Sequence, residues 1–263
     1  MSTSLAHKIA LDPTPEQRQF FGQAAGVSRF TYNWALAEWQ ERSQLGGKPK
    51  GHLLKKSFNA LRLVQFPWTY DVHRDATAQP FADLQRAFVN FWRGNAEYPR
   101  FKKKGQSRDS FYVANDKFHV IDKTVILPKV GVVKMRESLR FDGKILSATV
   151  SREADRWFIS LQVELPKGYY RTRTADGQVG VDLGILHLAT LSTGEVIDGP
   201  KPLKRALKRL KHANRGLHRR KQGSANRRKA QHRVAKLHAR LSHVRNDALH
   251  KLTSELCREN QAI

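Results

Sequence analysis

Cysteine is almost absent from this chain of 263 residues, in which Cys257 is the only one. A single cysteine excludes an intramolecular disulfide and a zinc site built from four cysteines. The sequence also lacks the long apolar run of a transmembrane helix, and its start, MSTSLAHKIALDPT, lacks the apolar core of a signal peptide. We therefore expect a cytoplasmic protein without a membrane partner.

Acidic residues are few relative to basic ones. The chain has 48 Lys and Arg against 23 Asp and Glu, which gives a formal net charge of +25. Such an excess favours a polyanionic partner, because each phosphate that is neutralised releases counterions. Hydrophobic residues still make up 40% of the chain, so we expect a folded protein and not a basic tail. Composition favours nucleic acid as the partner but leaves the activity open.

Asp and Glu are missing altogether between Gly199 and Asn246, where Lys and Arg occur 17 times and His five times. Apolar residues recur there every three or four positions, which predicts two amphipathic helices with a turn at residues 222–224. We expect a basic helical hairpin over residues 201–256 that binds phosphates, in preference to a merely solvated surface. The candidate phosphate ligands beside the turn are Arg219, Arg220, Lys221, Arg227, Arg228 and Lys229.

Helical periodicity also dominates the first third of the chain. Thr14-Pro15-Glu16-Gln17 is typical of a capped helix start, and apolar residues follow at helical spacing to about residue 93. Four tryptophans occupy positions at which we expect core side chains: Trp34, Trp39, Trp92 and Trp157.

Alternating patterns predict strands elsewhere. Residues 125–135, 144–153 and 156–166 alternate in this way and are separated by turns. Together with a strand at 5–11 they predict an antiparallel sheet or small barrel, into which the helices are inserted. Residues 167–177 are typical of a linker, and 178–199 predict two strands joined by a turn at Ser192-Thr193-Gly194.

Asp182 is placed between Val181 and Leu183 in the apolar stretch QVGVDLGILHLATLSTGE. A charge in such a strand is costly unless it is paired, and a metal ion is one candidate partner. Phosphodiester hydrolysis by two metal ions needs several converging carboxylates, and a rigid strand beside glycines would fix the first of them. A strand-end Asp bonded to backbone amides fits the same motif, so the motif alone leaves both interpretations open.

Four stretches in this order resemble the TnpB family of OrfB-type transposon proteins, which is related to type V CRISPR effectors. The first is LDPTPEQRQFFGQAAGVSRFTYNWAL, similar to a family segment often labelled a helix-turn-helix. The others are AEYPRFKKKGQSRDSF, VGVDLGILHLATLSTGE and LHRRKQGSANRRKAQHRVAKLHARLSHVRNDALHKL. Each stretch alone is a weak signal, but their combination is specific and extends from about residue 8 to the end.

The resemblance implies a multidomain α+β protein. A wedge-type antiparallel β-barrel would comprise residues 1–12 and 105–168, with a helical recognition lobe inserted over 13–104. A partial RNase H-like (RuvC) domain over 178–263 would contain the basic hairpin. Family members bind a guide RNA, pair it with target DNA and cut with a magnesium-dependent RuvC site. The resemblance makes Asp182 the catalytic metal ligand, and Arg100, Lys102, Lys103 and Lys104 contacts to nucleic acid.

The sequence departs from the family pattern near its end. The strands that carry the second and third RuvC carboxylates and the four-cysteine zinc ribbon do not appear, and Glu255 and Glu259 do not match the missing motif. We therefore expect a C-terminally truncated member that binds guide RNA and DNA at the nucleoid without productive Mg²⁺ binding or cutting. A missing C-terminal fragment is the expected protein partner.

Two alternatives stay open from the sequence. One is a non-enzymatic DNA-binding transposition accessory or regulator that uses the N-terminal helices. The other is one part of a split or decayed transposase gene.

Overall fold

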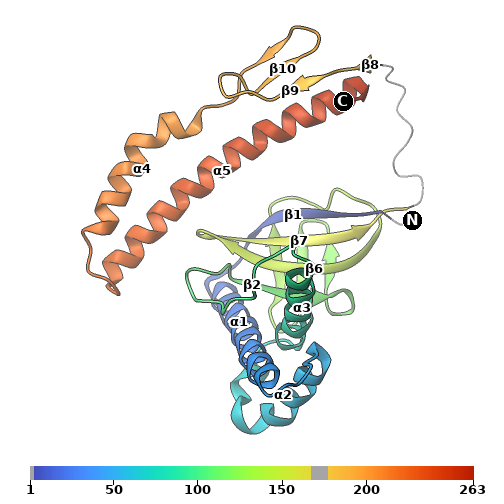
Figure 1. Cartoon of the computed structure of the whole chain (residues 1–263), viewed down its shortest axis with the longest axis vertical. Coiled ribbons are helices and arrows are strands. Elements are labelled where there is room, and N and C mark those ends of the chain that lie inside the picture. The colour runs from blue at the N-terminus through green and yellow to red at the C-terminus, as the bar shows by residue number, and fades with distance from the viewer. Residues whose placement is uncertain (1–2, 167–176) are drawn as a thin grey trace. The chain divides into compact units, whose positions relative to one another are not determined.

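The structure is a computed structural model that describes residues 3–166 and 177–263, except for the side chains at 202, 203 and 205 (Figure 1). The predicted linker at 167–177 lies outside the described residues except for Gly177. Contacts divide the chain into two units, Met1–Lys167 and Gly168–Ile263, and each is described by itself. In the described part of the chain, no helix has the length and apolarity needed to cross a membrane.

The first unit contains a seven-stranded antiparallel sheet with the order β2-β6-β7-β1-β5-β4-β3. Residues 4–10 of the central strand β1 pair with β7, whereas Leu11 and Asp12 pair with β5, as the N-terminal strand was expected to do. The strands are β1 Ser4–Asp12, β2 Ser110–Ala114, β3 His119–Ile121, β4 Thr124–Leu127, β5 Gly131–Met135, β6 Lys144–Glu153 and β7 Arg156–Glu164. The predicted antiparallel sheet is therefore confirmed.

Three helices are inserted between β1 and β2: α1 Pro15–Gln44, α2 Gly51–Gln65 and α3 Asp75–Trp92, with a 3₁₀ turn η1 at Pro67–Asp71. The predicted capping box is present, because Thr14 and Gln17 each accept a hydrogen bond from the backbone N–H of the other. The first half of α1 packs on the sheet, where Phe21 contacts Trp157 edge to face. One long helix thus joins the sheet core to a second, helical core.

Aromatic side chains fill that second core, which α1, α2 and α3 share. Trp39 stacks on Phe88 with ring centroids 4.2 Å apart, and Trp34 contacts Phe58 edge to face at 5.0 Å. The expectation of a core position is confirmed for Trp39 and Trp157 but is wrong for Trp92, whose side chain is 62% exposed. Trp92 is the last residue of α3, and its ring contacts those of Trp39 and Phe88 at the edge of the core while its other side faces solvent.

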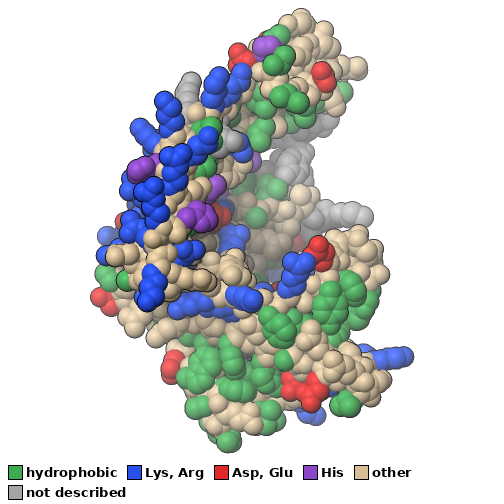
Figure 2. Space-filling model, turned by 60° about the vertical axis from the view of Figure 1, so that its left-hand side comes forward, with side chains coloured by type: hydrophobic (Ala, Val, Ile, Leu, Met, Phe, Trp, Pro, Cys, Tyr) green, Lys and Arg blue, Asp and Glu red, His purple; other side chains and the backbone are tan. Residues whose placement is uncertain are grey.

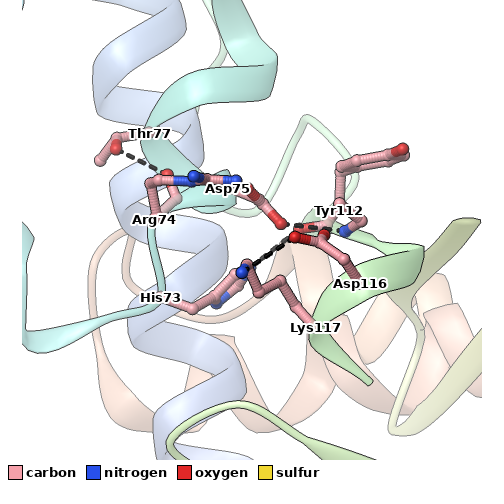
Figure 3. A network of polar contacts seen from close by, with 8 residues as sticks. His73, Arg74, Asp75, Thr77, Tyr112, Asp116 and Lys117 are labelled. Atoms are coloured by element: carbon pink, nitrogen blue, oxygen red, sulfur yellow. Dashed lines mark hydrogen bonds and ion pairs between the residues drawn. The ribbon is translucent and has the colours of Figure 1, made fainter. Parts of the chain in front are cut away.

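Buried polar contacts fasten the start of α3 to β2 (Figure 3). The Nε2–H of His73 donates to the carbonyl of Tyr112 at 2.8 Å, and a carboxylate oxygen of Asp75 accepts from the N–H of Ala114 at 2.9 Å. Both residues are only 5% exposed, and burial lowers the pKa of His73. The network fixes α3 in register with the edge of the sheet.

The second unit pairs short strands with a helical hairpin. Its elements are β8 Gly177–Gln178, β9 Val181–Asp182, β10 Ala189–Leu191, β11 Val196–Ile197, α4 Pro202–His218, α5 Ala225–Glu259 and β12 Asn260–Ala262. Strands β9, β10 and β11 are antiparallel, whereas β12 pairs with β8 in parallel. These pairings form two small sheets, and the end of α5 packs against them, where Leu252 and Leu256 share a buried cluster with Val179, Ala189 and Leu191.

The helical hairpin and its turn form where the sequence predicts them. Gly223 adopts a positive φ of 81° in the turn, and the Ser224 hydroxyl caps α5 by accepting from the N–H of Arg227. The strand prediction was less accurate, because residues 183–188 leave the ladder and divide the expected first strand into β9 and β10. Leu183, Ile185 and Leu186 in this loop are mostly exposed.

Candidate nucleic-acid interface

The hairpin of α4 and α5 has an apolar seam and basic outer faces. Leu210 and Leu241 are buried in the seam, while Lys and Arg side chains gather along the hairpin in Figure 2. Beside the turn, Arg219, Arg220, Lys221, Arg228 and Lys229 are all exposed. Five of the six residues that the sequence singled out here are therefore accessible to solvent as cations, which suits a phosphate backbone.

Arg227 differs from its neighbours, because it is half-buried and faces the other helix. Its guanidinium donates to the carbonyl of Leu217 at 3.3 Å and to that of Arg220 at 3.0 Å. Leu217 lies in the last turn of α4, where its carbonyl also accepts from the Arg220 N–H at 3.2 Å, and Arg220 follows the end of the helix. Arg227 thus joins the two helices of the hairpin beside the turn. The sequence predicted it as a phosphate ligand like its neighbours, because the number of charges along the chain does not distinguish the two roles.

The second predicted basic segment, Arg100–Lys104, is anchored to the helical core. Tyr98 packs edge to face against Phe88 and Phe91 of α3, at 5.5 and 5.3 Å between ring centroids. Arg100, Lys103 and Lys104 are exposed, and Arg100 forms an exposed ion pair with Glu97. The anchoring contact therefore leaves three of the four predicted cations accessible to a ligand.

Lys102 is held differently from the other cations of this segment. Asn33 of α1 bonds its backbone on both sides, accepting from the Lys102 N–H at 2.7 Å and donating to its carbonyl at 2.9 Å. The ammonium lies 3.9 Å from the centroid of the buried Tyr32 ring. Burial is the main cause that lowers the pKa of Lys102, and the nearby Arg29 adds to it, while Asp83 acts in the opposite direction.

Lys102 also lines a polar groove of about 540 Å³ between α1, α3 and strands β2, β6 and β7. Arg86 and Asp83 line it from α3, and Tyr112, Thr149 and Gln162 line it from the sheet. Sequence reasoning missed Asn33, Asp83 and Arg86. Nothing in the periodicity of α1 or α3 indicates that these helices meet the segment at 98–104, because that contact depends on how the chain folds back on itself.

Asp182 lies at the end of β9, paired with Thr190 of β10, and its side chain is exposed. The carboxylate of Asp182 is therefore not a buried charge that requires a partner. Among the described residues, no group of three or more His, Cys, Asp and Glu side chains could hold a metal ion. At the same end of these strands, His187 Nδ1 lies 2.8 Å from a carboxylate oxygen of Asp198.

Comparison with known proteins gives two family matches. Residues 1–48 match an IS605 OrfB model described as a helix-turn-helix domain, and residues 149–263 match one described as "Probable transposase".

Three curated relatives have similar names. The Escherichia coli K12 protein "Putative RNA-guided DNA endonuclease InsQ" is 31% identical over 260 residues, covering 98% of this chain and 64% of the relative. A Streptomyces pristinaespiralis "Putative RNA-guided DNA endonuclease" is 35% identical over 265 residues, covering 98% and 65%. The Mycobacterium tuberculosis "Putative RNA-guided DNA endonuclease MT2953" is 25% identical over 296 residues, covering 98% and 64%. The chain thus spans a little less than two thirds of the length of these relatives.

Proposed function

The chain belongs to the OrfB (TnpB) family of IS605-type transposon proteins, and on that premise we propose that it binds guide RNA and target DNA through its basic surfaces. The observation that carries this proposal is the exposed cationic surface of α4 and α5, which contains no acidic residue between Gly199 and Asn246. A surface of one charge sign holds a nucleic-acid backbone without reading its sequence. In an RNA-guided complex, sequence reading belongs to base pairing.

We assign the two units to the family's architecture. The seven-stranded sheet is the wedge-type barrel, and α1, α2 and α3 form the recognition lobe. The second unit is the start of a RuvC domain, because its three antiparallel strands are followed by helices and by β12, which is parallel to β8. This order supports an RNase H-like sheet, in which a fourth strand joins the first in parallel.

The residues described here do not fit a two-metal nuclease site. Such a site needs several carboxylates around ions roughly 4 Å apart, whereas Asp182 has no metal-binding group around it in the described chain. We therefore derive no cleavage step and propose that this polypeptide alone binds nucleic acid without cutting it. The proposed lack of cutting concerns this polypeptide alone and does not extend to Mg²⁺ in longer relatives. We also expect the protein to bind DNA at the nucleoid.

A second candidate is a DNA-binding transposition accessory, which the helix-turn-helix match over residues 1–48 favours. A recognition helix of that class follows a first helix after a tight turn. Here α1 runs uninterrupted from Pro15 to Gln44, and its buried residues include Phe21, Ala35 and Trp39. This geometry favours the guide-RNA proposal over the accessory.

Purification of the chain from its host, followed by sequencing of bound RNA, tests the proposal. We expect RNA of one defined sequence to co-purify, and purified protein with that RNA, matching DNA and Mg²⁺ to bind the DNA and leave it intact. Duplex-specific binding without RNA would support the accessory instead. Guide-dependent cutting would overturn the proposed lack of nuclease activity while leaving the binding proposal in place.

A further inference from the structure

Lys102 occupies a different setting from the two lysines that follow it. Lys103 and Lys104 extend into solvent, whereas the ammonium of Lys102 is held against the Tyr32 ring and lines the polar groove. A lysine that neutralises phosphates works as a mobile, hydrated point charge. Lys102 lacks that mobility, because its backbone is bonded on both sides by Asn33 and its side chain is partly buried.

The groove is not a purely cationic site of the kind that suits a phosphate group. Arg86 lines it beside Lys102, but Asp83 contributes a carboxylate, held in place by a hydrogen bond at 3.0 Å from the Gln79 side chain. This carboxylate offsets one of the two cations and would repel a phosphate. The remaining polar lining consists largely of hydroxyl and amide groups from Ser28, Ser110, Tyr112, Ser147, Thr149 and Gln162. Such groups bond to the uncharged donors and acceptors of bases and sugars.

We infer that Lys102 acts as a fixed hydrogen-bond donor to a base or sugar acceptor of bound nucleic acid, and that Asn33 is the residue that positions it. Lys103 and Lys104 act as phosphate counterions beside it. This inference deepens the proposed function and rests on it. Lys102 is then the one residue of this basic segment whose position the fold fixes, whereas Lys103 and Lys104 act through charge alone.

Asn33 suits this positioning role because both of its contacts are with backbone atoms of Lys102. Replacing the Lys102 side chain leaves both hydrogen bonds intact, so Lys102→Met, which keeps the length of the side chain and has no N–H, tests the donor without disturbing the loop. Replacing Asn33 by Ala removes both bonds, while Asn33→Asp keeps the acceptor for the Lys102 N–H and loses the donor. The two positions can therefore be varied separately.

The experiment measures binding of a short duplex DNA and a single-stranded RNA, both of mixed sequence, over a range of salt concentrations. We expect Lys102→Met to weaken binding by about tenfold at every salt concentration, as for loss of one hydrogen bond from a charged donor. Lys103→Gln should instead reduce the slope of log K against log salt by roughly 0.7–0.9. Asn33→Ala should weaken binding in the wild-type chain and have no further effect beside Lys102→Met, with Asn33→Asp intermediate.

Thermal unfolding of each variant separates positioning from loss of fold. A purely structural Asn33 would lower the affinity equally with or without Lys102, and such additivity overturns the positioning role. A slope change for Lys102→Met equal to that for Lys103→Gln overturns the donor role. Failure of the wild-type chain to bind either probe would overturn the proposed function and this inference together, whereas the two preceding results overturn the inference alone.

Discussion

Gly177 and Asn260 lie opposite each other in the parallel pair of β8 and β12, although the whole helical hairpin separates them in sequence. A Cβ atom at Gly177 would come within 2.8 Å of the Asn260 side-chain oxygen and 3.0 Å of the Glu259 carbonyl. The two backbones approach this closely only because residue 177 has no side chain. This pair therefore ties the end of α5 to the first strand of the second unit.

Substitution of Gly177 by Ala should open this pair. Because the Glu259 carbonyl belongs to the backbone, the clash cannot be relieved by a rotamer change, and we expect a loss of about 1–3 kcal/mol in the stability of the second unit. Hydrogen exchange of the backbone amides at residues 177–182 and 260–262 measures this loss of stability. The matched control is Gly216→Ala in α4, where a Cβ meets nothing within 4 Å. Unchanged exchange in the Gly177 variant would refute the close approach.

Replacement of the basic residues beside the hairpin turn should have two different effects, one on nucleic-acid binding and one on stability. Changing the exposed Arg228 and Lys229 to Gln should leave the fold unchanged and reduce the salt slope of nucleic-acid binding by roughly 0.7–0.9 for each phosphate that is no longer neutralised. Changing Arg227 to Gln should instead destabilise the hairpin, because the Arg220 carbonyl loses the Arg227 guanidinium and the Leu217 carbonyl keeps only the Arg220 N–H. Salt titrations and helix melting by circular dichroism measure the two effects. If all three variants changed the salt slope and the helix melting to the same extent, this distinction between Arg227 and the exposed residues would be contradicted.

Much of the fold follows from the sequence because its signals are local. The Thr14 cap, the strand alternation at 144–164 and the Gly223 turn each depend on a few neighbouring residues, and the structure has all of them. The groove does not follow, since it is formed by α1, α3 and strands β2, β6 and β7, whose register no local pattern encodes.

Two errors have the same origin. Periodicity gave Trp92 a core phase but could not show that it lies at the edge of the core, where it contacts Trp39 and Phe88 and stays mostly exposed. The apolar neighbours of Asp182 suggested burial, whereas the residues after it leave the sheet as an exposed loop.

Asp182 should tolerate substitution. Its side chain is exposed at the end of β9, so Asp182→Ala should change the stability of the second unit by no more than about 0.5 kcal/mol. Nucleic-acid binding by this polypeptide should also be unchanged, since the proposed contacts are the cations of the hairpin and of the segment Arg100–Lys104. Urea unfolding and binding at one salt concentration test both statements. A Mg²⁺-dependent loss of binding in the variant would show that Asp182 holds a metal ion after all.

Acid should destabilise the first unit through His73. Burial is the largest influence on its pKa and lowers it, Lys129 lowers it further, and the Tyr112 hydrogen bond and Asp75 act in the opposite direction. Because the folded-state pKa lies below the unfolded value of about 6.5, this group's contribution to stability is complete above that pH and is lost as pH falls through the folded-state pKa. His7, whose pKa burial also lowers, should add to the effect.

His73→Gln should make the first unit less sensitive to acid, because a Gln amide can donate to the Tyr112 carbonyl and does not titrate. Urea unfolding followed by tryptophan fluorescence reports this unit alone, since all five tryptophans lie within residues 34–157. Between pH 7 and pH 5 we expect the wild-type chain to lose up to about 1.4 kcal/mol per pH unit more than the variant. His119→Gln, at an exposed position, is the matched control and should retain the wild-type response. If His73→Gln and His119→Gln lose stability in parallel, the acid sensitivity arises elsewhere in the unit, with His7 as the next position to replace.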